Sequence, residues 1–90
     1  MTLIALPGED FVRAGLDDLA RGAATVPALL VSVGAPRLRR LGIEVSAPLA
    51  SPEHRLYELL AREDAATAHG RYNALIRELV SFERAAECVR

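Results

Sequence analysis

The side chains best placed to bind a charged ligand are three neighbouring arginines, Arg37, Arg39 and Arg40. Guanidinium groups hold phosphate through charge-assisted hydrogen bonds, and the free amides at a helix N-terminus add to such a site. Pro36 predicts the start of a short helix here, which Gly42 ends. No glycine-rich loop accompanies the arginines, so an anion site is an alternative to an ordinary solvated helix face.

The same arginines indicate a second ligand, because arginines on a helix in the major groove of DNA can read guanine. The short basic helix follows an apolar segment and a glycine-containing turn, which is loosely the order of a helix-turn-helix. It holds no Asn, Gln, Ser or Thr to read base edges. A formal net charge of -1 gives the chain no positive field to attract nucleic acid. DNA binding through these arginines is therefore our alternative function.

Metal-ligand types gather further along the chain, at Glu53, His54, Glu58, Asp64 and His69. His54 and Glu58 are four residues apart and would share one face of a helix. Metal sites in helical bundles use several inward carboxylates with Glu-x-x-His spacing, which this chain lacks. We therefore expect no metal and no cofactor.

Candidate nucleophiles are few. Cys88 is the only cysteine, so the chain can form no intramolecular disulfide and no multi-cysteine metal site. Nucleophilic catalysis needs a base and an orienting group around the nucleophile, and Cys88 lies in a terminal turn expected to fray. Ser32 and Ser81 fall inside helical patterns, where a hydroxyl more often points to solvent or bonds the backbone. We expect that the protein is not an enzyme.

The composition is that of one globular domain spanning residues 1–90. About half of the residues are apolar (51%) and about a quarter charged (26%), which argues against intrinsic disorder. All basic residues are arginines, a bias typical of a GC-rich bacterial genome. The N-terminus has no basic region followed by a long apolar core, and the apolar run Ala23 to Ala35 is shorter than a membrane helix needs. We expect a cytoplasmic protein with no membrane partner.

Breakers divide the first half of the chain into short elements. Leu3 to Leu6 reads as a short extended arm that ends at a Pro-Gly turn. Acidic Glu9 and Asp10 then favour the start of a helix, and Gly22 is a plausible stop for it.

A second apolar element follows. Thr25 reads as an N-cap with Pro27 in the first turn of a helix that runs to about Val33. Its β-branched valines would also suit a strand, and we favour the helix as the buried centre of the domain. The segment from Gly42 to Ala50 has no sustained period and is predicted to be a loop, either a binding element or a plain connection.

Ser51 and Pro52 form the clearest helix start in the chain, with serine as N-cap and proline at the first helical position. Alanines keep helix propensity high between Arg62 and Gly70. The segment after Ser51 is therefore either one long helix that bends near Gly70 or two antiparallel helices that meet there. We favour the break, because a second helix folded back would cover the leucines of the first.

The last third of the chain carries an apolar stripe at helical spacing. Its members, which we call the C-terminal stripe, are Tyr72, Leu75, Ile76, Leu79, Val80 and Phe82. Leu75, Leu79 and Phe82 lie on one flank, and the other three lie on a second flank. Two flanks can serve two neighbours, one within the chain and one outside it.

These observations predict an all-α, single-domain bundle of four to five helices, with the Ala23 to Val33 segment central and the last helix packed across it. The predicted function is a non-enzymatic helical protein-protein interaction module of a bacterial cytoplasm. It would act as a homodimer or as a small accessory or regulatory subunit, using the C-terminal stripe as its interface. The sequence does not name the partner.

Overall fold

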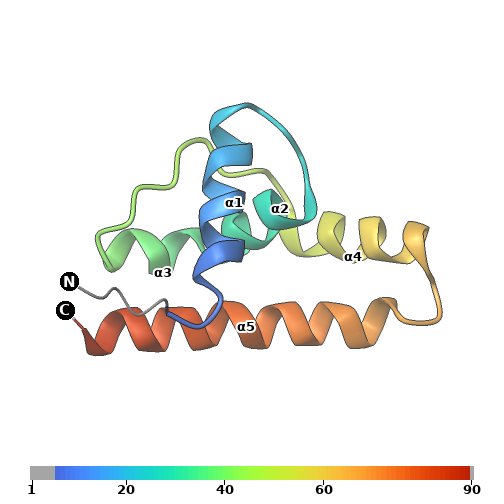
Figure 1. Ribbon diagram of the computed structural model, residues 1–90. Helices are drawn as coiled ribbons and strands as arrows, with labels where there is room; N and C mark the ends of the chain where they lie inside the picture. The colour runs from blue at the N-terminus through green and yellow to red at the C-terminus, as the bar shows by residue number, and fades with distance from the viewer. Residues whose placement is uncertain (1–5, 90) are drawn as a thin grey trace.

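The computed structural model describes residues 6–89, which fold into helices and contain no strand (Figure 1). The predicted all-α bundle is confirmed, with five helices in this described range. These are α1 (Glu9–Ala20), α2 (Val26–Val33), α3 (Ala35–Arg40), α4 (Pro52–Glu63) and α5 (Ala68–Cys88). Of the predicted extended arm, Leu3 to Leu6, all but Leu6 lies outside the described residues.

The helices form two layers with a crossing element. Figure 1 shows α3, α2 and α4 following one another above α5, which runs the whole length of the molecule, while α1 crosses the others. The 21 residues of α5 explain the elongated shape, with principal extents of 42 × 25 × 21 Å. The last helix thus serves as the platform on which the other elements pack.

The close packing of α1 on α5 and α2 depends on two glycines. Gly8 has a φ of +74°, and a Cβ on it would lie 3.0 Å from the carbonyl oxygen of Glu78 on α5. A Cβ on Gly15 would lie 2.3 Å from the carbonyl oxygen of Pro27, closer than real Cβ contacts come. Backbone therefore meets backbone where α1 crosses α5 and where it crosses α2.

Helix α2 is the centre of the core, as predicted. The hydroxyl of Thr25 accepts a hydrogen bond from the amide of Ala28 at 3.2 Å, which makes Thr25 the expected N-cap. Leu29, Leu30 and Val31 are at most 2% exposed. The helix prevails over the strand because its neighbours cover it on nearly every side and the threonine satisfies one of its free amides.

The segment between α3 and α4 is a loop, as predicted from Gly42 to Ala50. Ser32 of α2 holds the loop by hydrogen bonds. Its hydroxyl donates to the carbonyl of Ala28 (2.8 Å) and accepts from the amide of Leu49 in the loop (3.0 Å). Val45 is buried in the core at 2% exposure. The loop is therefore anchored to α2 rather than loosely connected.

Helices α4 and α5 are antiparallel, as favoured from the sequence, but the predicted position of the break was wrong (Figure 1). The chain turns at Asp64–Thr67, and Gly70 lies inside the first turns of α5. The Asp64 carboxylate accepts a hydrogen bond from the amide of Ala66 at 3.0 Å. This local bond replaces a helical one and ends α4, whereas an exposed glycine is tolerated in a helix.

Ser51 is a second correction. Helix α4 begins at Pro52 as predicted, but the Ser51 side chain makes no capping hydrogen bond. The residue adopts a left-handed conformation, with φ 48° and ψ 51°, whereas an N-cap side chain reaches its amides from extended backbone. The preceding loop holds Ser51 in this conformation, so of the two predicted start signals only Pro52 acts at the start of α4.

Candidate functional site

The C-terminal stripe is divided between the core and the surface. Leu79 and Phe82 are buried, at 3% and 5% exposure, and complete the monomer's own core. Leu75, Ile76 and Val80 are half-buried. The predicted flank of Leu75, Leu79 and Phe82 is thus split, because the elements above α5 cover Leu79 fully and Leu75 only partly.

Tyr72, the first residue of the stripe, is also half-buried and belongs to the contact between α4 and α5. Its ring lies 5.7 Å from that of Tyr57 on α4, centroid to centroid. Burial, and then the carboxylate of Glu53, raise the pKa of the Tyr72 phenol. This tyrosine therefore joins the two antiparallel helices within one chain.

Two apolar grooves flank α1, one on each side of the helix. The first, which we call the Leu75 groove, has a volume of about 410 Å³ and lies between α1, the start of α2 and the N-terminal half of α5. Its lining residues are Phe11, Val26, Pro27, Arg71, Ala74 and Leu75. A residue of the C-terminal stripe thus forms part of an open apolar surface.

The second groove, which we call the Phe82 groove, has a volume of about 400 Å³ and lies beyond α1 over the C-terminal half of α5. Its apolar lining includes Leu6, Leu16, Leu41, Ile43, Phe82 and Val89. Val89 is 70% exposed, so its apolar side chain stays in contact with water. Glu9 and Arg13 pair with each other at its edge and supply its charged rim.

The arginine group has partners within the chain. Arg37 lies 3.6 Å from the Glu83 carboxylate and 3.7 Å from the Glu87 carboxylate, so it ties α3 to α5. Arg39 donates to the carbonyl of Val45 at 2.8 Å and ties α3 to the following loop. Arg40 is exposed beside them. In the structure, Arg37 and Arg39 therefore stabilise the packing of α3 against α5 and against the following loop.

Glu83 is a site residue that the sequence analysis missed. Its side chain is buried, and a Cβ on Gly34 would lie 3.0 Å from its carboxylate oxygen. Burial raises the pKa of the Glu83 carboxyl, and the nearby charges of Arg37 and Arg40 partly oppose this. The signal for it was its spacing, because Glu83 falls between Leu79 and Ala86 on the apolar face of α5.

No family model, curated protein or solved structure matches the chain.

The candidate metal ligands do not converge. His54 lies 3.5 Å from Glu58, and His69 bonds Asn73 at 3.2 Å, each pair on its own helix. Within residues 6–89, no three or more His, Cys, Asp or Glu side chains form a group that could hold a metal ion.

The candidate nucleophiles are apart as well. Cys88 and Ser81 are exposed on α5, whereas Ser32 is buried and its hydroxyl is hydrogen-bonded to backbone groups.

No helix in the described part of the chain has both the length and the apolar character to cross a bilayer.

Proposed function

We propose that this chain is a helical protein-protein interaction module without catalytic activity, and that it associates as a homodimer through the grooves beside α1. The observation that supports this proposal is the pair of apolar grooves, each of about 400 Å³, on the two sides of one short helix. Open apolar surface of this kind is costly in water and favours burial against another protein.

Apolar and charged side chains would have different roles in binding a partner to the grooves. Leu75 and Phe82 supply apolar floor, and each apolar side chain that a partner buries there contributes about 1.5–3 kcal/mol before the costs of association. Arg71 and Arg13 lie at the edges, where charges set orientation more than affinity. A small accessory subunit seated on a different protein would use the same surfaces.

Substitutions in the grooves test this proposal. Ala74→Glu and Val89→Glu each place a carboxylate in one groove, and both positions are exposed, so the core is left intact. Because an unpaired charge in an apolar contact is costly, we expect either change to weaken self-association roughly tenfold or more in sedimentation equilibrium.

Ser81→Glu is the matched control, since Ser81 is exposed on α5 and lines neither groove. It should leave self-association unchanged. Equal association of all four proteins, wild type included, would contradict an interface in either groove.

DNA binding, the alternative function, lacks an observation of this kind in its favour. The structure engages Arg37 and Arg39 with neighbours in the chain, and α3 follows α2 after the single residue Gly34. A helix-turn-helix separates its two helices by a longer turn so that the second can enter the major groove.

A further inference from the structure

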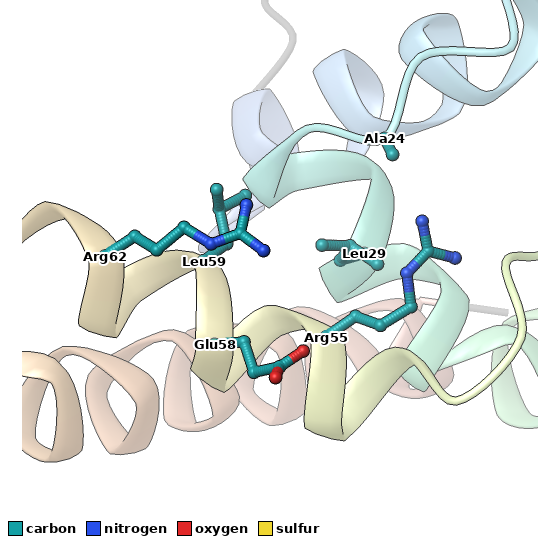
Figure 2. Close-up of a pocket in the computed structure, with 6 residues that line it drawn as sticks. All are labelled: Ala24, Leu29, Arg55, Glu58, Leu59 and Arg62. Carbon is teal, nitrogen blue, oxygen red and sulfur yellow. The ribbon is translucent and has the colours of Figure 1, made fainter.

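A smaller pocket lies between α4 and α2 and shares no lining residue with either apolar groove. It has a volume of about 200 Å³ and is lined by Ala24, Leu29, Arg55, Glu58, Leu59 and Arg62. Figure 2 shows the Arg62 side chain extending toward Leu29 from one side and the Arg55 side chain rising on the other side, with Ala24 above and Glu58 below. Two guanidinium groups therefore border a small apolar floor.

The arginines of this pocket are not used to hold the fold together. The side chain of Arg62 makes no ion pair or hydrogen bond with any residue in the range 6–89. Arg55 makes one long hydrogen bond, from Nη1 to the carbonyl of Ala50 at 3.5 Å. Glu58 is within helical reach of both, yet the partner it contacts is His54, at 3.5 Å. Both guanidinium groups keep donors free for a ligand.

Charge and size together select the ligand. Two arginines and one glutamate give the pocket a net charge that suits a single negative charge better than a doubly charged phosphate. The floor of Leu29 and Leu59 suits an apolar body beside that charge. About 200 Å³ is less than the ~300 Å³ at which pockets for drug-sized ligands begin, so the ligand is small.

We propose that the pocket bordered by Arg55 and Arg62 binds a small monocarboxylate with an apolar body, either a free acid or the last residue of a polypeptide. The carboxylate oxygens accept hydrogen bonds from the two guanidinium groups, and the apolar body lies over Leu29. The Glu58 carboxylate repels the ligand's charge and limits its affinity. This site is independent of the homodimer.

Titration of the labelled full chain in amide-correlation NMR tests the proposal, with 4-methylpentanoate as the free acid and N-acetylleucine as the chain terminus. We expect saturable shifts at the amides around Leu29 and Leu59 for at least one of them. Binding of N-acetylleucine alone assigns the ligand to a chain terminus, and binding of 4-methylpentanoate assigns it to a free acid. The uncharged 4-methylpentanamide should produce no saturable shift.

Three variants sharpen the test. Arg62→Gln and Arg55→Gln should each weaken binding by roughly tenfold, while Glu58→Gln should strengthen it about two- to threefold because a repulsive charge is removed. Arg77→Gln, at an exposed arginine on α5 outside the pocket, is the matched control and should not alter affinity.

Equal binding of the amide, unchanged affinity in both arginine variants, or no saturation up to roughly 50 mM would overturn the assignment. None of these results depends on self-association, so the homodimer and the pocket can fail separately.

Discussion

At the scale of single residues, the buried carboxyl of Glu83 lies on the apolar face of α5, between the buried Leu79 and Ala86. The spacing could have revealed its burial. The partner that makes burial tolerable, Arg37, lies far away in sequence and is brought near only by the packing of α3 on α5.

Glu83 should make stability depend on pH. Burial raises its pKa in the folded chain, so the folded state holds the proton more tightly than the unfolded state does. The stabilising contribution is therefore complete below the ordinary carboxyl pKa and is lost as the pH rises through the raised value.

We expect Glu83→Gln to raise the free energy of unfolding at pH 7.5 by about 1 kcal/mol, because Arg37 keeps Glu87 as a partner. The difference from wild type should shrink as the pH falls through the raised pKa of Glu83, and it should be small at about pH 4, below the ordinary carboxyl pKa. Urea unfolding at the two pH values measures it. A variant less stable than wild type at pH 7.5 would mean that the ion pair with Arg37 outweighs the cost of burial.

At the scale of elements, local signals predicted most helix boundaries, since Gly22 and Gly42 follow the ends of α1 and α3 as expected. Thr25 and Pro52 mark real starts, because a cap or a proline acts within one turn and needs no tertiary partner. The end of α4 depends on one side-chain bond of Asp64, in a stretch whose alanines favour a continuous helix. Local propensity could therefore predict two helices but not the residue at which they separate.

Close contact of elements gives a matched pair of glycine substitutions. Gly15→Ala places a methyl group against the Pro27 carbonyl and the Val31 side chain, so α1 and α2 must move apart. We expect a loss of about 1–3 kcal/mol in unfolding free energy.

Gly70→Ala is the control, because a Cβ there meets nothing within 4 Å and the residue is helical. It should gain up to about 1 kcal/mol from helix propensity. Denaturant unfolding followed by circular dichroism measures both changes. If Gly15→Ala were as stable as Gly70→Ala, the backbone contact between α1 and α2 would not exist as described.

At the scale of the whole molecule, the arrangement on α5 decides which apolar residues remain open. Spacing along the C-terminal stripe could predict one apolar face, but not that α1 would cross it and leave a groove on each side. For this reason Leu79 is buried in the core, whereas Leu75 lines a groove. The grooves also recruit residues from distant segments, such as Phe11 and Ile43, that no local pattern connects to α5.

The mass of the protein in solution tests the proposed homodimer most directly. Light scattering during size-exclusion chromatography at low and high salt should give twice the chain mass of 9.7 kDa at both, because association through apolar grooves is not screened by salt. A mass of 9.7 kDa at both salt concentrations would contradict the homodimer, and a dimer lost at high salt would contradict the apolar grooves as its interface.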